Sequence, residues 1–415
     1  MRTLKYSSPP LQVDGPPLPV ITRAMTTAAP GHPVYRDMAT TIFERMSARA
    51  RDTGAINLGQ GFPEGPGPRE VLAAAAAAML ERSSQYPPMA GLPELRAAVA
   101  GHYARHQGLD LSPQEVIVTS GATEALAAAL LALVRPGDEV LLFAPLYDAY
   151  LPLVERAGGV AKVIPLAPPG WAVQRAALEA AIGPRTRFLL LNDPLNPAGA
   201  VLRDADLALI AEFCVAHDLV AICDEVWEHM VFDGAVHRPL MGFAGMRDRT
   251  VKIGSAGKIF SVTGWKVGWM CAAPPLAALL ARAHQFLTFT TPPALQWACA
   301  QALDWDADWF DRQKLGYRAS RDRLAAGLAD AGYIVLPSGG TWFLAVDLVA
   351  SGIALDDRAF CDRLIDEAGV AAIPFSAFYP TDPVTHLVRL CFCKSDATLD
   401  AAIARLATFR QKLVS

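Results

Sequence analysis

The sequence predicts an α/β fold built on a mostly parallel sheet, and three observations lead to this prediction. Short apolar segments alternate with segments whose apolar residues recur at helical spacing, as in "EVIVTS" followed by "GATEALAAALLALV". The apolar segments are continuous, which is typical of strands covered by helices on both faces. Polar residues interrupt the apolar text at strand ends, where such sheets bind their ligands.

The elements follow in order along the chain. Residues 40–54 predict an amphipathic helix, 55–63 a short strand or loop, 68–83 an alanine-rich helix, and 92–108 a helix closed by glycine. Five strands are then expected at 115–120, 139–145, 187–194, 219–225 and 250–257, with helices at 121–134, 148–158 and 205–218. Helical segments after residue 274 precede two strand-like segments, 342–348 and 386–393, which indicate a second layer of α+β character.

This order predicts a large α/β domain at 71–324 and a smaller α+β domain assembled from both chain ends, 37–70 and 325–415. Residues 1–36 are proline-rich and predict a partly disordered N-terminal arm. That arm lacks the continuous apolar segment of a signal peptide, and both Met1 and Met25 fit as the natural start.

Composition and charge exclude several classes of function. The 415 residues are 52% apolar, enough for a large core, and the net charge of −4 is spread without a basic patch. We therefore expect binding neither to nucleic acid nor to a membrane surface. The longest apolar runs have about ten residues, whereas a membrane span needs roughly 20.

The cysteines and histidines predict no metal site. Seven cysteines, an odd number, lie mostly in apolar segments, which indicates reduced thiols in a cytoplasmic protein. Cys391 and Cys393 form a C-x-C on a predicted strand, with no second pair at zinc-site spacing.

Four strand ends carry candidate binding residues, each with a structural alternative. Ser120–Thr123 opens a helix and could hold a phosphate on its free amides, or serve as an ordinary N-cap. Tyr147 could stack on a flat ligand or belong to the core, and Asn192 and Asn196 could bind a ligand or stabilise a plain loop. Asp224 follows a buried strand and could pair with a cationic ring nitrogen or cap the next helix.

Two lysines stand in the otherwise small and apolar stretch "GSAGKIFSVTGWKVGW". Unless Lys258 and Lys266 lie along the surface with their ammonium groups in water, one is used covalently and the other faces an anion. With the strand-end residues, they suit a ligand that has a phosphate, an aromatic ring, a phenolic oxygen and a basic ring nitrogen. Pyridoxal 5′-phosphate (PLP) has these four groups and needs a Schiff-base lysine.

Seven motifs in order resemble the fold-type I PLP-dependent enzymes, and most closely the class I/II aminotransferases of the kynurenine, methionine and N-succinyldiaminopimelate group. They are "INLGQGFPE", "QYPPMAGLPELR", "VTSGATEAL", "NDPLNPAG", "CDEVWEHMVFDG", "GSAGKIFSVTGWKVGW" and "HLVRLCFCKSDATL". They span about residues 37–410, with Lys258 standing 34 residues after Asp224. The resemblance implies the PLP-dependent transferase fold, PLP as cofactor, and an amino acid and a 2-oxo acid as substrates.

The resemblance also implies roles for individual residues. Lys258 would bind the cofactor and then move the substrate proton, and Asp224 would keep the ring nitrogen protonated. Asn196 would bind the phenolic oxygen and border the substrate, and Tyr147 would stack on the ring. The residues that would hold the phosphate are Gly121, Ala122, Thr123, Ser255 and Lys266.

Four more residues receive roles in the same way. Tyr86 would reach the phosphate of a neighbouring subunit, which implies a homodimer with shared active sites. Arg389 would bind the substrate α-carboxylate through its planar fork. Gly61 would let that carboxylate approach the backbone, and Phe289 would line the partner's side-chain pocket.

The sequence departs from the family pattern at two positions. Trp227 stands where a tyrosine usually donates to the phenolic oxygen, and Leu195 stands where histidine is common. The indole N–H of Trp227 could donate instead. No arginine lies in "FLTFTTPPALQW", where dicarboxylate-specific relatives carry a second clamp, so we expect neutral, apolar or aromatic donors, with a succinylated diaminopimelate as another possibility.

The reaction itself has two alternatives. A PLP-dependent C–S β-lyase acting on cysteine conjugates would share the first proton removal with an aminotransferase. A regulator that uses the fold to bind an effector would need a DNA-binding domain, and the 36 residues before the matching motifs are too short for one.

Overall fold

The computed structural model describes residues 31–414. A short helix, α1 (Pro33–Arg36), belongs to an N-terminal unit that ends at Met38, and Ala39 begins a second unit that includes all other elements. Most of the predicted arm, residues 1–36, lies outside the described residues. The unit that begins at Ala39 contains every candidate site residue.

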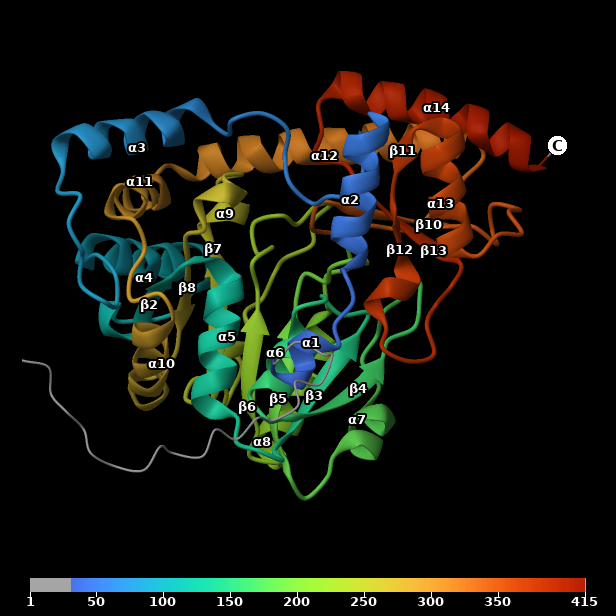
Figure 1. Cartoon of the computed structure of the whole chain (residues 1–415). Coiled ribbons are helices and arrows are strands. Elements are labelled where there is room, and N and C mark those ends of the chain that lie inside the picture. Colours follow the sequence, from blue (N-terminus) through green and yellow to red (C-terminus); the bar gives the residue numbers. More distant parts are fainter. Residues whose placement is uncertain (1–30, 415) are drawn as a thin grey trace, which may run out of the picture. The chain divides into compact units, whose positions relative to one another are not determined.

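A seven-stranded sheet forms the centre of this unit (Figure 1). Its strands are β2 (Val116–Thr119), β3 (Glu139–Ala144), β4 (Val160–Pro165), β5 (Thr186–Asn192), β6 (Val220–Asp224), β7 (Thr250–Ser255) and β8 (Gly268–Cys271). They are ordered β2-β8-β7-β6-β5-β3-β4. Strand β8 is antiparallel to both β2 and β7, and the other neighbouring strands are parallel. The predicted mostly parallel sheet is therefore confirmed, with β4 and β8 as strands that the sequence reading did not identify.

The helices between residues 39 and 330 pack on this sheet, on the two smaller sheets described below or on one another. They are α2 (Ile42–Thr53), α3 (Arg69–Glu81), α4 (Pro93–Gln107), α5 (Gly121–Leu133), α6 (Tyr150–Arg156), α7 (Arg175–Ala181), α8 (Asp204–Ala216), α9 (Ala256–Ile259), α10 (Pro274–Leu287), α11 (Pro293–Leu303) and α12 (Ala307–Asp330). Helix α5 packs on β7 and β8 and against α10 (Figure 1). Every residue of β2 and β3 is buried, as expected for strands between two helical layers.

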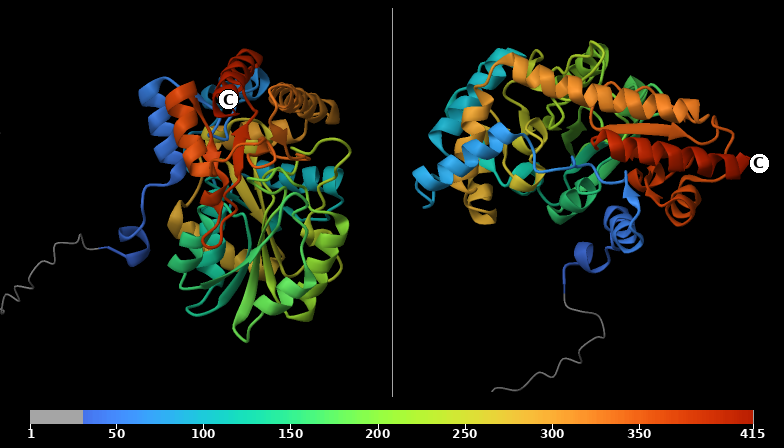
Figure 2. Two further views of the ribbon diagram at one scale, coloured as in Figure 1. Left: turned by 90° about the vertical axis from the view of Figure 1, so that its right-hand side faces the viewer. Right: turned by 90° about the horizontal axis from the view of Figure 1, so that it is seen from above.

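Two smaller sheets bring distant parts of the chain together. The strands β9 (Ile334–Val335), β10 (Phe343–Asp347), β12 (Ile373–Pro374) and β13 (Leu387–Cys391) form an antiparallel sheet. The strand β1 (Ile56–Asn57) pairs in parallel with β11 (Val370–Ala371). Helices α13 (Asp357–Ala368) and α14 (Asp396–Val414) pack together, and α14 runs beside α12 (Figure 2).

The helix α12 continues without a break through residues 324 and 325, where the sequence reading placed a domain boundary. The division into a large domain at 71–324 and a small domain at 37–70 and 325–415 stays a prediction. Among residues 31–414, no helix combines the length and the apolar character needed to cross a membrane.

Candidate active site

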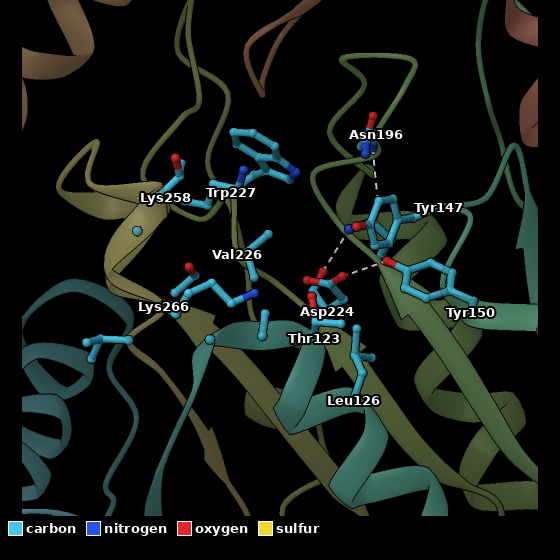
Figure 3. A pocket seen from close by; sticks show the side chains of 17 residues that line it. Thr123, Leu126, Tyr147, Tyr150, Asn196, Asp224, Val226, Trp227, Lys258 and Lys266 are labelled. Carbon is cyan, nitrogen blue, oxygen red and sulfur yellow. Dashed lines mark hydrogen bonds between the residues drawn. The ribbon is translucent and has the colours of Figure 1, made fainter. Parts of the chain in front are cut away.

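A cavity of about 230 Å³ opens at the carboxyl ends of the parallel strands (Figure 3). It is lined by Gly121, Ala122, Thr123, Leu126, Tyr147, Tyr150, Asn192, Asn196, Asp224, Val226, Trp227, Ser255, Gly257, Lys258, Thr263, Lys266 and Val267. Most of these residues end a strand or lie in the segment just after one, which is where an open α/β sheet binds its ligands.

The sheet register fixes the centre of the cavity. Asn192 and Asp224 are paired neighbours at the ends of β5 and β6. Asn192 Nδ2 donates to the Asp224 main-chain oxygen at 3.0 Å, and Asn192 Oδ1 accepts the Asn196 N–H at 2.9 Å. The loop that carries Asn196 is thus attached to the strand that carries Asp224.

The Asp224 carboxylate has one oxygen bound and one oxygen without a partner. Tyr150 Oη donates to Oδ2 at 2.6 Å, whereas the buried Oδ1 makes no hydrogen bond within the described part of the chain. Burial raises the pKa of Asp224, and the hydrogen bond from Tyr150 opposes that rise. No helix follows Asp224 directly, so the alternative role as an N-cap is excluded.

The turn after β2 forms a small, cationic end of the cavity. Gly121 has φ of +77°, a conformation that glycine adopts at little cost, and it begins α5. A Cβ at this position would lie 3.5 Å from Lys266 Nζ, so the Lys266 amine is directly beside the helix N-terminus. Free helix amides together with an ammonium group suit a phosphate.

Lys258 lies on α9, just after β7, with its amine beside two indole rings that pack edge to face on each other. Nζ is 4.6 Å from the Trp227 ring centroid and 5.1 Å from that of Trp342. Burial lowers the pKa of Lys258 to about 8, although Cys393, Cys391 and Asp224 act in the opposite direction. A lysine with a lowered pKa is neutral more often, which makes its amine a better nucleophile.

Arg389 lies on β13 and reaches the edge of the cavity through Asn196. Its Nη1 donates to Asn196 Oδ1 at 3.0 Å, and its Nη2 donates to the Gly59 main-chain oxygen. The guanidinium carbon lies 4.0 Å from the Phe343 ring centroid. Burial lowers the pKa of Arg389 to about 10, and the buried Nε has no partner among residues 31–414.

The residues that follow Asp224 in the chain contribute to a second buried cluster. Glu225, Glu228 and His237 offer ligand atoms within 4.8 Å of one another. The fully buried Lys252 donates from Nζ to both carboxylates, to Glu228 at 2.8 Å. An ammonium group therefore already neutralises the charge that a metal ion would neutralise, and the cluster connects β7 to the segment after β6.

The cavity brings together ten of the fourteen residues predicted as site residues: Lys258, Asp224, Gly121, Ala122, Thr123, Tyr147, Asn196, Trp227, Ser255 and Lys266. The other four, Tyr86, Gly61, Arg389 and Phe289, lie outside its lining. Arg389 borders it through Asn196, and Gly61 packs so closely on Phe343 that a Cβ would lie 2.5 Å from its Cζ.

Tyr86 and Phe289 contact each other instead, with ring centroids 5.5 Å apart, and the Tyr86 side chain is exposed. The sequence reading missed Tyr150 as a partner of Asp224. Its spacing of three residues from Tyr147 is the only sequence signal, and the two rings do pack edge to face at 5.7 Å.

The residues that are present fit PLP. The unpartnered Asp224 Oδ1 suits a protonated ring nitrogen, Lys266 and the α5 amides suit a phosphate, and the Lys258 amine suits a covalent bond. Tyr147 and Asn196 lie beside the same space (Figure 3). The cavity thus offers a partner for each chemical group of the cofactor.

Comparisons with known proteins agree with this geometry. Residues 53–406 match the family "Aminotransferase class I and II". A probable N-succinyldiaminopimelate aminotransferase of Mycobacterium tuberculosis is 48% identical over 91% of this chain and 98% of its own length. The methionine aminotransferase of Escherichia coli is 41% identical over 89% of this chain and 96% of its own length.

Solved structures support the same assignment. The N-succinyldiaminopimelate aminotransferase from Mycobacterium tuberculosis has a TM-score of 0.87 at 49% identity, with 91% of this chain and all of that chain covered. The methionine aminotransferase YbdL from Escherichia coli has a TM-score of 0.88 at 39% identity over 92% of this chain and all of that chain. The chain therefore belongs to the class I and II aminotransferases, PLP-dependent enzymes with the fold-type I architecture.

Proposed function

We propose that this enzyme moves the amino group of a neutral, apolar or aromatic L-amino acid to a 2-oxo acid in a ping-pong cycle. The observation that supports this proposal is the position of Arg389 at the edge of a cavity that also holds Lys258 and Asp224. One guanidinium can bind one α-carboxylate. The residues that line the cavity include no arginine, so the side chain of the donor finds no second guanidinium there.

PLP, when bound, supplies an electron-accepting ring for the electrons released at the substrate Cα. In our proposal Lys258 binds the cofactor covalently, then accepts the Cα proton on Nζ and returns it. Asp224, held by Tyr150, keeps the ring nitrogen protonated through Oδ1. Gly121, Ala122, Thr123, Ser255 and Lys266 hold the phosphate.

The remaining roles concern orientation. Asn196 binds the phenolic oxygen while it accepts a hydrogen bond from Arg389, so one amide couples the cofactor and substrate sites. Tyr147 stacks on the ring. Trp227, at the position of the usual tyrosine, presents its ring face to Lys258 Nζ, which supports a role in orienting the lysine more than in binding the phenolic oxygen.

A second candidate donor is N-succinyldiaminopimelate. The 48% identity to the probable aminotransferase for that compound, over 98% of its length, is the observation that favours it. This donor has further carboxylates far from its α-carbon, which need cationic partners. The cavity lining of this protomer offers only Lys258 and Lys266 as cationic groups.

A screen of donors against acceptors tests both candidates. Methionine, phenylalanine, kynurenine, aspartate and N-succinyldiaminopimelate would each be combined with several 2-oxo acids, and the products identified by mass. We expect turnover with the first three and little with aspartate. Preference for the succinylated donor would establish the second candidate. Release of pyruvate, ammonia and a thiol from a cysteine conjugate would indicate the C–S lyase reaction.

The covalent role of Lys258 has its own test. Borohydride reduction should attach the cofactor to the peptide that contains Lys258, and Lys258→Ala should abolish turnover while the phosphate end of the site still binds cofactor. Lys314→Met, which removes a partly exposed lysine outside the cavity, should leave the labelled peptide unchanged. Labelling of any other lysine would disprove the assignment.

We also propose a homodimer with shared active sites in the cytoplasm. Tyr86 is 82% exposed and packs on Phe289, which is 40% exposed, so two exposed aromatic rings lie together on one surface. Exposed aromatic groups of this kind mark protein interfaces. The seven cysteines all carry free thiols, which supports a reducing compartment.

A further inference from the structure

Two thiols lie in contact beside the site. Cys391 ends β13, and the Lys394 N–H donates to the Phe392 oxygen at 2.8 Å, which makes a three-residue turn centred on Cys393. The turn brings both side chains to one side, with Cys391 Sγ 3.2 Å from Cys393 Sγ. Among the described residues this is the one pair of cysteines in such contact.

The chemistry of this pair differs from that of the other cysteines. Burial raises the pKa of Cys214, Cys223, Cys271, Cys299 and Cys361, so those thiols are unreactive. Burial also acts to raise the pKa of Cys391. The hydrogen bond from Cys393 and the charges of Lys394 and Arg389 outweigh it and lower that pKa to about 7.

The same segment holds the glycine loop at residues 58–62. Arg389 Nη2 donates to the Gly59 oxygen, the Cys391 N–H donates to the Leu58 oxygen at 2.8 Å, and Lys394 Nζ donates to the Phe62 oxygen at 2.9 Å. The two sulfurs therefore lie in the middle of a segment with three donors to this loop. A change in the backbone at Cys393 would be transmitted to the loop and to Arg389.

We propose that Cys391 and Cys393 are a site of reversible oxidation by hydrogen peroxide, which forms an intramolecular disulfide and weakens substrate binding. The Cys391 thiolate attacks one peroxide oxygen, the O–O bond breaks, and a sulfenic acid and hydroxide form. The Cys393 sulfur then attacks the Cys391 sulfur, and the sulfenic oxygen leaves. In total two thiols and one peroxide give one disulfide and two waters, with two electrons passing from sulfur to oxygen.

The geometry bears on both access and effect. Neither cysteine lines the cavity, so the oxidant must be as small as peroxide to reach the thiols through the packed protein. The sulfurs themselves are buried, which excludes larger oxidants such as glutathione disulfide. A disulfide bond is about 2.05 Å long, so the sulfurs must approach by roughly 1 Å. Displacements of about 1 Å in substrate-positioning groups can lower rates about 100-fold.

The decisive measurement is chemical. The holoenzyme would be treated with peroxide, alkylated after denaturation and cut with trypsin, whose cleavage after Arg389 and Lys394 releases residues 390–394 with both sulfurs and no others. We expect this peptide to lose two hydrogen atoms and resist alkylation, while the five other cysteines stay alkylated. Glutathione disulfide should not produce the change. A peptide that remains fully alkylated, or prior oxidation of another cysteine, would overturn the proposal.

Variants separate the oxidation from its effect on catalysis. Cys393→Ala removes the resolving thiol, so peroxide should leave a sulfenic acid on Cys391 that dimedone traps. Oxidised wild-type enzyme should show a KM for the amino donor raised on the order of ten-fold or more, and a phosphine reductant should reverse it. Cys361→Ala, a buried cysteine away from this segment, should respond as wild type does. An oxidised peptide with an unchanged KM would disprove the link to substrate binding, without bearing on the proposed aminotransferase activity.

Discussion

Tyr150 has a hydroxyl group that is used entirely by Asp224, and its removal should change cofactor binding. Tyr150→Phe keeps the ring but deletes the 2.6 Å hydrogen bond to Oδ2. A hydrogen bond to a charged group contributes about 1.5–3 kcal/mol, so the dissociation constant of PLP should rise on the order of ten-fold or more. The pH dependence of the bound cofactor's absorbance should shift as well. Without the Tyr150 hydrogen bond, burial raises the pKa of Asp224 with less opposition.

Tyr147→Phe is the matched control for this prediction. Its hydroxyl makes no hydrogen bond to the described residues, yet its ring borders the same cavity. Equal losses of PLP affinity in the two variants would show that the Tyr150 hydroxyl has no special role. Absorbance titration of the bound cofactor gives both the affinity and the pH dependence.

Arg389 should matter for substrate and little for cofactor. Arg389→Ala leaves the substrate carboxylate without its charged partner, which costs about 2–5 kcal/mol, or roughly 30- to several-thousand-fold in kcat/KM. Arg389→Lys retains the charge but not the planar fork, so it should recover only part of the loss. A variant with near-native kcat/KM would mean that the α-carboxylate binds elsewhere, and an unchanged cofactor spectrum is the check on folding.

At the residue scale the sequence predicted the cavity well because its residues follow strands. Lys258 and Asp224 interrupt apolar text, so each was visible without a structure, whereas Ser255 was assigned only through the resemblance to the family. Tyr150 was not, because it lies within an amphipathic helix where an aromatic residue is ordinary. The orientation of Trp227 toward Lys258 also required the structure, since the Trp342 ring that packs on Trp227 beside the amine comes from the residue before β10, 115 residues after Trp227.

The elements β6 and β7 are joined by buried charges that should make stability depend on pH. Burial acts to lower the pKa of His237, but hydrogen bonds with Asp193 and Glu225 raise it from 6.5 to about 9. The protonated His237 therefore stabilises the folded state fully below about pH 6.5, and this contribution is lost as the pH rises through 9. A shift of this size corresponds to about 3 kcal/mol.

Urea unfolding at pH 6 and pH 9.5 measures this contribution. The free energy of unfolding of the wild type should fall by about 3 kcal/mol more over this range than that of His237→Gln, which cannot titrate. Glu225 also faces Lys252, and the Glu225 pKa of about 2 lies outside the tested range, so it does not contribute to the difference. Equal losses in the two proteins would contradict the assignment.

Element prediction succeeded where local pattern and burial agree. The alternation of continuous apolar strands with amphipathic helices predicted eight elements of the central layers: β2, β3, β5, β6, β7, α5, α6 and α8. The strand β8 has only four residues and follows a left-handed turn at Lys266. Its antiparallel direction depends on that turn and on pairing with β2 and β7, which no periodicity in the sequence reveals.

At the scale of the whole molecule, shared active sites can be tested by mixing inactive subunits. Lys258→Ala lacks the covalent lysine, and Tyr86→Ala lacks the proposed phosphate contact across the dimer. In a hybrid dimer one site contains an intact Lys258 with the intact Tyr86 of the other subunit. After subunit exchange, we expect each hybrid dimer to have close to half the activity of a wild-type dimer.

The alternative arrangement gives a different result. If Tyr86 acts within its own subunit, every hybrid site keeps one of the two defects and the mixture gains no activity. Light scattering on each variant is the control, because both must remain dimers for the test to apply. The sequence predicted this association by resemblance alone, since one protomer contains only half of any interface.

The hydrogen bond between Arg389 and Gly59 joins residues 330 positions apart. During synthesis, the turn after β2, the strands β5 to β7 and Lys266 leave the ribosome well before Arg389 does, so a nascent chain holds the cofactor-binding residues before it has a substrate clamp. Closing so long a loop carries an entropic cost that grows with the logarithm of its length. With the proposed role of Arg389, a growing polypeptide is thereby unable to bind an amino acid for catalysis until translation is nearly complete.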